Sequence, residues 1–271
     1  MAHELATAST TPASFPSAAT PASLMTAEPH AVPPSGDVVH QSTPPQPSAS
    51  EAEYDAMYEQ GNALIDRLRA TEQPRVFIIS GPSGVGKDSV IDHLRVHLPN
   101  ARYVVTATTR PMRRGEIDGI HYHFMTKEAF VDGIAHDQFI EHALVYDNHY
   151  GVPRTPIEEG LASGQHVIIK VDVKGAATLR RCIAGATSIF LAPEKMEELL
   201  DRLRSRKTDD PDVLLKRFRT ASQELERAEE FDYVVFNERG KLDEAIFRIR
   251  SIIQTEQARI NKPEIVITNA N

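Results

Sequence analysis

The sequence has little of what secreted or membrane-spanning proteins depend on. Its 271 residues include one cysteine, Cys182, which excludes an internal disulfide and fits a reducing compartment. No stretch approaches the ~20 consecutive apolar residues of a transmembrane helix. The first 20 residues lack Lys, Arg and a continuous apolar run, which argues against a secretory signal or a mitochondrial transit peptide. We therefore expect a cytoplasmic protein with no membrane partner.

An excess of positive charge is also missing. The chain has 30 Lys and Arg against 38 Asp and Glu, for a formal net charge of −8. Proteins that hold nucleic acid usually need a broad basic field. We expect no nucleic-acid partner, and any anion-binding site must be local. Composition leaves a monomer and a homodimer equally open.

Residues 1–50 differ in composition from the rest of the chain. They contain nine of the 18 prolines, three acidic residues and no Lys or Arg. Such a segment cannot bury enough apolar area to offset the entropy of ordering it, so we predict a disordered tail. In residues 51–72, Tyr54, Met57, Leu64 and Leu68 recur at helical spacing and predict a helical lead-in.

Short apolar runs alternate with helical patterns after Pro74. Nearly all-apolar strands are typical of a parallel sheet that is covered by helices on both faces. The runs are residues 76–79, 167–169, 188–191 and 233–236. The pattern predicts an α/β fold with a mostly parallel sheet flanked by helices over residues 73–265.

A glycine-rich loop follows the first predicted strand and precedes an amphipathic helical pattern. Its glycines allow the backbone to wrap closely around a phosphate, while loop N–H groups and the helix N-terminus point at the anion. Lys87 would place its positive charge on the β- and γ-phosphates of ATP. We predict a P-loop whose ATP-binding residues are Gly81, Pro82, Ser83, Gly84, Val85, Gly86, Lys87, Asp88 and Ser89.

One position departs from the usual P-loop pattern. The residue after the lysine is ordinarily Ser or Thr, whose hydroxyl contacts Mg²⁺, and here it is Asp88. A carboxylate is a stronger Mg²⁺ ligand than a hydroxyl. Asp88 is therefore our candidate metal ligand, with Mg²⁺ the expected cofactor beside ATP.

A second anion site is predicted between residues 106 and 151. Arg110 and Arg113 carry planar forks suited to bidentate phosphate binding, and Tyr122 and Tyr150 can add hydroxyl hydrogen bonds. The carboxylate of Glu141 can accept from both the N1–H and the N2–H₂ of guanine. Adenine offers no such pair and would leave the carboxylate unpaired. The pattern favours a nucleoside monophosphate acceptor, with GMP as the substrate.

From the P-loop to about residue 260 the sequence resembles the guanylate kinase family. The motif T-T-R-x-x-R-x-G-E-x-x-G-x-x-Y-x-F, over residues 108–124, carries the resemblance. The resemblance implies the reaction ATP + GMP ⇌ ADP + GDP, with dGMP as a further acceptor. It also implies a core (73–104, 165–195 and 223–265), a GMP-binding insertion (105–156) and a helical lid (196–222).

The same resemblance assigns four acceptor-side positions. Thr106 stands where the family commonly has a Ser that touches the acceptor phosphate, and Val152 replaces a Ser or Thr that reads guanine O6. Asp172 matches the second Asp of the family's L-D-x-D strand end, near acceptor and metal. Lys170 replaces the first Asp of that motif, which reverses the charge.

Arginines on two predicted helices are typical of a lid that closes over the transferring phosphoryl group. The resemblance singles out Arg206 and Arg217, which join Lys87 as candidate catalytic residues. Asn237, at the end of the last predicted strand, matches a family position near the adenine of ATP.

Two other functions remain open from sequence. Relatives that phosphorylate a ribose phosphate also carry the run from Gly86 to Ser89, but they lack the long motif of residues 108–124. Guanylate-kinase-like domains that only bind partner proteins characteristically degrade the P-loop, which is intact here. Both alternatives rank below GMP phosphorylation.

Overall fold

A computed structural model describes residues 50–69, 73–145, 147–204 and 211–269. Helix α1 (Glu51–Arg69) buries none of its residues. The predicted tail, except for Ser50, and the candidate catalytic residue Arg206 lie outside the described residues. Within the described residues, no helix is both long and apolar enough to cross a membrane.

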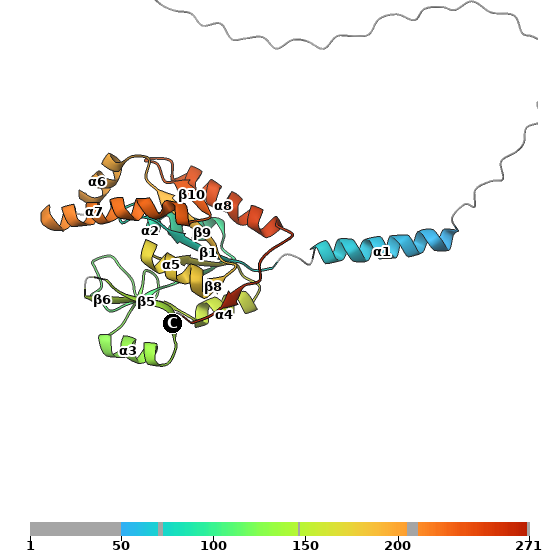
Figure 1. Ribbon diagram of the computed structural model, residues 1–271, viewed down its shortest axis with the longest axis horizontal. Helices are drawn as coiled ribbons and strands as arrows, with labels where there is room; N and C mark the ends of the chain where they lie inside the picture. The colour runs from blue at the N-terminus through green and yellow to red at the C-terminus, as the bar shows by residue number, and fades with distance from the viewer. Residues whose placement is uncertain (1–49, 70–72, 146, 205–210, 270–271) are drawn as a thin grey trace, which may run out of the picture. The chain divides into compact units, whose positions relative to one another are not determined.

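A five-stranded sheet forms the centre of the domain (Figure 1). Its strand order is β10-β9-β1-β7-β2, and every neighbouring pair is parallel. The strands are β1 (Val76–Ser80), β2 (Arg102–Val104), β7 (Val167–Lys170), β9 (Thr187–Ala192) and β10 (Tyr233–Phe236). The predicted α/β fold with a mostly parallel sheet is confirmed.

Alternating residues of β1 build two cores, one on each face of the sheet. Phe77 and Ile79 pack in the core that includes buried residues of α2 (Lys87–His97) and α8 (Leu242–Ala258). Val76 and Ile78 pack in the other core, with α4 (Thr155–Ala162) and α5 (Val173–Cys182). Each fully buried side chain of this size contributes about 1.5–3 kcal/mol through removal from water. The all-apolar strands thus follow from helices that cover both faces.

A second, four-stranded sheet comes from the chain between β2 and α4. Its order is β4-β3-β6-β5, with β3 and β4 parallel and the other pairs antiparallel. The strands are β3 (Ala107–Thr108), β4 (His123–Phe124), β5 (Phe139–Val145) and β6 (Asn148–Pro153), and α3 (Lys127–Ala135) lies between β4 and β5. Ile140 of this sheet packs with Val104 and Ile157 of the main domain, which joins the two sheets through one core.

The remaining elements are α6 (Met196–Arg204), α7 (Pro211–Glu226), the 3₁₀ turn η1 (Arg227–Glu230), β8 (Ile183–Ala184) and β11 (Val266–Ile267). Strands β8 and β11 pair antiparallel with each other in a small separate sheet. Helix α7 continues past residue 222, where the predicted lid ends, to Glu226. The chain turns from β1 into α2 at the sheet edge where parallel α/β sheets bind their ligands.

Candidate active site

Three glycines give the loop after β1 a backbone path that other residues cannot follow. Gly81, Gly84 and Gly86 have φ angles of 147°, 87° and 99°. A Cβ on Gly81 would lie 2.3 Å from the carbonyl oxygen of Leu191, and one on Gly84 would lie 2.9 Å from the side chain of Leu203. Gly86 precedes α2 in the left-handed conformation, so the helix begins at Lys87. The loop is a tight cradle open at a helix N-terminus.

Lys87 is half-buried and lies across this cradle. Its Nζ donates to the carbonyl oxygens of Gly81 at 2.6 Å and Pro82 at 3.1 Å. Burial lowers the pKa of Lys87, and the nearby carboxylates of Glu224 and Asp172 act in the opposite direction. The backbone itself therefore positions the ammonium beside the loop N–H groups.

Two polar side chains fix the cradle from outside through one carbonyl, that of Val85. Asn237 Nδ2 and Arg202 Nη1 each donate to it at 2.8 Å. A Cβ on Gly86 would lie 2.6 Å from Asn237 Nδ2. Asn237 is buried, and its amide holds the loop; the sequence-based assignment to adenine remains a prediction. Arg202 was not among the predicted site residues.

Helix α7 contacts the cradle at Ser83 through two side chains that lie seven residues apart. Arg217 Nη2 donates to Ser83 Oγ at 3.1 Å, and the Ser83 N–H donates to Glu224 Oε2 at 3.1 Å. Burial raises the pKa of Glu224, and Lys87 opposes that shift. Arg217 thus contacts the loop, and its role as a lid arginine remains a prediction. Glu224 was missed by sequence reasoning, although the i, i+7 spacing from Arg217 puts both on one helix face.

Arg110 is held in the second sheet by a carboxylate. Its Nη1 and Nη2 donate to Glu116 Oε2 at 2.7 Å and Oε1 at 2.5 Å, and the side chain is 8% exposed. The hydrogen bond with Arg110 lowers the pKa of Glu116 and raises that of Arg110. The Arg113 N–H also donates to Glu116 Oε2 at 2.7 Å. Glu116 belongs to the long motif, yet only the structure shows that its carboxylate holds the Arg110 guanidinium and the Arg113 backbone N–H.

Aromatic rings surround the Arg110 guanidinium. Its Cζ lies 4.9 Å from the ring centroid of Tyr122 and 5.4 Å from that of Phe124. Tyr122 and Tyr150 meet edge to face, with centroids 6.1 Å apart. The structure thus brings Arg110, Tyr122 and Tyr150 together, while the side chain of Arg113 is exposed on the same loop. We call Arg110, Glu116, Tyr122 and Tyr150 the acceptor cluster.

Glu141 and Asp172 meet at the start of α5. Asp172 caps that helix by accepting from the Gly175 N–H at 2.7 Å. A Cβ on Gly175 would lie 3.3 Å from the Asp172 carboxylate and 3.5 Å from the Glu141 carboxyl carbon. Glu141 is 5% exposed, and burial, reinforced by Asp172, raises its pKa to about 7. Burial disfavours the ionised form of Glu141, so a ligand that donates hydrogen bonds to the carboxylate would stabilise that form.

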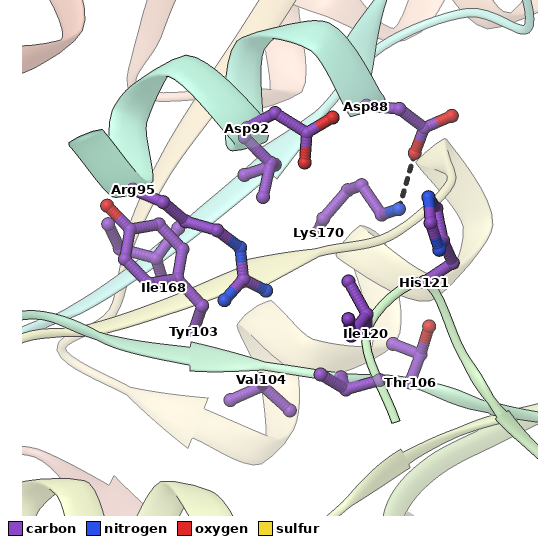
Figure 2. Close-up of a pocket in the computed structure, with 12 residues that line it drawn as sticks. Asp88, Asp92, Arg95, Tyr103, Val104, Thr106, Ile120, His121, Ile168 and Lys170 are labelled. Carbon is purple, nitrogen blue, oxygen red and sulfur yellow. Dashed lines mark hydrogen bonds and ion pairs between the residues drawn. The ribbon is translucent and has the colours of Figure 1, made fainter. Parts of the chain in front are cut away.

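Two acceptor-side candidates are largely inaccessible. Val152 is 1% exposed and packs in the core with Ile140 and Ile157, so its predicted contact with the base remains untested. Thr106 is 7% exposed and lines a cavity of about 20 Å³ together with Asp88, His121 and Lys170 (Figure 2).

The two charged departures from the family pattern, Asp88 and Lys170, contact each other. Asp88, in the first turn of α2, accepts from Lys170 Nζ of β7 at 2.5 Å. Ser89 follows on the exposed side of the helix. Among the described residues, no group of three or more His, Cys, Asp or Glu side chains could hold a metal ion. A metal at this site would therefore need ligands from the substrate as well as Asp88.

Comparison with known proteins agrees with this geometry. The sequence model of the family described as "Guanylate kinase" matches residues 73–256. The chain is 44% identical over 201 residues to "Guanylate kinase 2, chloroplastic/mitochondrial" of Oryza sativa subsp. japonica, covering 74% of this chain and 70% of the relative. It is 37% identical over 182 residues to the guanylate kinase of Carboxydothermus hydrogenoformans, covering 67% and 88%.

A solved structure is similar as well. The crystal structure of guanylate kinase from Anaplasma phagocytophilum matches with a TM-score of 0.56 and 30% identity, over 70% of this chain and 89% of that one. The family match spans the P-loop, the acceptor cluster and the main sheet as one continuous domain. On this ground the chain belongs to the guanylate kinase family.

Proposed function

We propose that the chain transfers the terminal phosphoryl group of ATP to GMP, giving ADP and GDP, and that it also accepts dGMP. One observation carries the proposal. Lys170 lies 2.5 Å from Asp88 of the P-loop helix and 5.2 Å from the ring centroid of Tyr122 in the acceptor cluster. A single side chain therefore spans the donor cradle and the acceptor cluster, which is the proximity that direct transfer between two phosphates requires.

The chemistry asks for alignment and charge neutralisation rather than a strong base. A monophosphate is already an anionic nucleophile at neutral pH, so its oxygen can attack the γ-phosphorus once the two are in line. Lys87 and Arg217 would neutralise charge on the transferring group, with Arg206 as a further cation. Arg110, Arg113, Tyr122 and Tyr150 would hold the acceptor phosphate, joined by the hydroxyl of Thr106.

Recognition of guanine would rest mainly on Glu141. Its carboxylate can accept from N1–H and N2–H₂, and burial makes an unpaired carboxylate costly there. Asp172 would support the acceptor beside it. Val152 cannot hydrogen-bond to O6, so we assign the larger share of base discrimination to Glu141.

The donor side offers one carboxylate, that of Asp88, as a ligand for Mg²⁺. Mg²⁺ with phosphates is commonly held by one or two carboxylates, substrate oxygens and water. The Asp88 side chain is 64% exposed at the start of α2, and Lys170 pairs with its Oδ1. Asp88 would hold the ion, and Mg²⁺ would supply neutralisation of the β- and γ-phosphate charge.

A coupled assay of ADP release tests the function. The full chain is assayed with ATP and Mg²⁺ against GMP, dGMP, AMP, UMP and ribose 1,5-bisphosphate. We expect GMP to give the highest kcat/KM, followed by dGMP. Equal use of AMP would contradict the guanine assignment. Preference for the ribose phosphate would favour the phosphokinase alternative, and no turnover with any acceptor would favour a domain that only binds partners.

A further inference from the structure

The two charged residues that depart from the family pattern form one unit. Asp88 stands where a hydroxyl residue is usual, and Lys170 stands where a carboxylate is usual. Figure 2 shows Lys170 pointing toward the Asp88 carboxylate at the first turn of α2. Lys170 Nζ lies 2.5 Å from Asp88 Oδ1. The positive charge of Lys170 thus lies at the end of β7, and the negative charge of Asp88 lies in the first turn of α2.

The pair is asymmetric in its exposure. The side chain of Lys170 is 16% exposed, whereas that of Asp88 is 64% exposed. Withdrawing an ammonium from water is costly, and an ion pair with a solvent-exposed partner recovers little of that cost. Protein stability alone is therefore a poor reason for placing this half-buried cation here.

The ammonium lies on the acceptor side of the donor helix. It is 5.2 Å from the ring centroid of Tyr122, and the Arg110 guanidinium lies 4.9 Å from the same centroid. Lys170 also lines the cavity to which Thr106 contributes. Two cations from different elements therefore gather around one tyrosine that is expected to contact the acceptor phosphate.

We propose that Lys170 is a phosphate-binding residue that takes an oxygen of the acceptor monophosphate, while Asp88 holds its ammonium in position. The inference rests on the proposed function and adds a cation to its acceptor site. An ammonium has three N–H donors, so one bond to Asp88 leaves two for phosphate oxygens.

Binding measurements that compare GMP with guanosine test the inference. Calorimetry on the full chain, with EDTA and without ATP, gives Kd for both ligands in wild type, Lys170→Met, Lys170→Arg and Lys127→Met. Guanosine has the same base and sugar but no phosphate. Lys127→Met makes the same chemical change at an exposed residue of α3. The melting temperature of each variant is measured alongside.

We expect Lys170→Met to raise Kd for GMP about tenfold or more, the loss typical of one charge-assisted hydrogen bond. Its Kd for guanosine should be unchanged, Lys170→Arg should keep most of the GMP affinity, and Lys127→Met should match wild type. Unchanged GMP affinity in Lys170→Met overturns the inference. Equal losses for GMP and guanosine also overturn it, because they would assign Lys170 a structural role.

The proposed function has a separate point of failure. If wild type binds GMP no more tightly than guanosine, or does not phosphorylate GMP, the acceptor assignment itself is wrong. If wild type shows both properties and Lys170→Met retains the full GMP affinity, the function stands and only the role of Lys170 is rejected.

Discussion

The donor cradle and the acceptor cluster hold their cations in different ways. In the cradle, Lys87 donates to two backbone carbonyls, those of Gly81 and Pro82. In the acceptor cluster, Arg110 is held by both oxygens of the Glu116 carboxylate. The first site is built mainly from backbone and the second mainly from side chains.

This difference decides how each site responds to change. A backbone cradle depends on φ angles and close approach, so its glycines are the sensitive positions. A side-chain cluster depends on charge and orientation, so a single carboxylate can alter it without disturbing the chain path. Substitutions in each region therefore show whether that region depends on the backbone path or on side-chain charge.

The largest expected effect is on turnover, at the donor side. Lys87→Ala should lower kcat by about 10²–10³-fold, the cost of removing one donor that stabilises transition-state charge. The melting temperature should change little, because the ammonium serves phosphate and, in the described part of the chain, donates to two loop carbonyls rather than packing in the core. Timed ADP-release assays and thermal melts check both parts, with Lys127→Ala as control. Substantial activity in folded Lys87→Ala would show that the cradle is not the donor site.

The next effect is on stability and compares one glycine from each region. Gly81→Ala should lower the free energy of unfolding by about 3 kcal/mol or more, through a backbone clash and a strained φ. Gly119, in the acceptor motif, has a φ of 73°, but nothing lies within 4 Å of the position that a Cβ would take there. Gly119→Ala should cost only about 1 kcal/mol. Urea unfolding measures both, and equal costs would contradict a backbone-built cradle.

The third effect is on acceptor binding. Glu116→Gln removes the charge that fixes the Arg110 fork, so KM for GMP should rise several-fold, up to about tenfold, with KM for ATP unchanged. Steady-state kinetics, with ATP and GMP varied in turn, measures KM for each substrate separately. A lower KM for GMP would reveal instead that Glu116 competes with phosphate for Arg110.

The sequence predicts a structural feature best where that feature depends only on residues that are close together in the chain. The turn between β1 and α2 and the strand at 233–236 lie where the sequence pattern predicts them, because both depend on neighbours in the chain. The ATP-binding role of residues 81–89 stays a prediction. The two-residue strands β3 and β4 have no periodicity to read and were not anticipated. Glu224 and Arg202 contact the loop from elements more than 100 residues away in the chain. The spacing of Glu224 from Arg217 indicates a shared helix face, but no local pattern indicates that either residue contacts the loop.

The exchanged charges at Asp88 and Lys170 show the same limit. Sequence identifies each as a departure, but only the fold, with β7 placed next to β1, shows that they pair. The roles of the individual site residues remain predictions. The fold class and the family are established more firmly than those roles because they rest on the whole domain.

The last expected effect is a pH dependence that is traced to Glu141 on the acceptor side. Burial raises the pKa of Glu141 to about 7 from its ordinary value of 4.5, so the folded state holds this proton more tightly than the unfolded state. The resulting stabilisation is present below pH 4.5 and is lost as pH rises to about 7. The free energy of unfolding of wild type, relative to Glu141→Gln, should therefore fall across this range.

Binding of guanosine should follow the opposite trend. The base needs an ionised Glu141 to accept its two donors, so affinity should increase by up to about tenfold per pH unit below pH 7 and level off above it. Guanosine is the ligand of choice because a phosphate would add its own titration near pH 6. Calorimetry between about pH 5.5 and 8 measures Kd in wild type and Glu141→Gln. A flat profile in the mutant beside a sloping wild-type profile supports Glu141 as the residue that reads guanine, whereas identical slopes would assign the titration to another group.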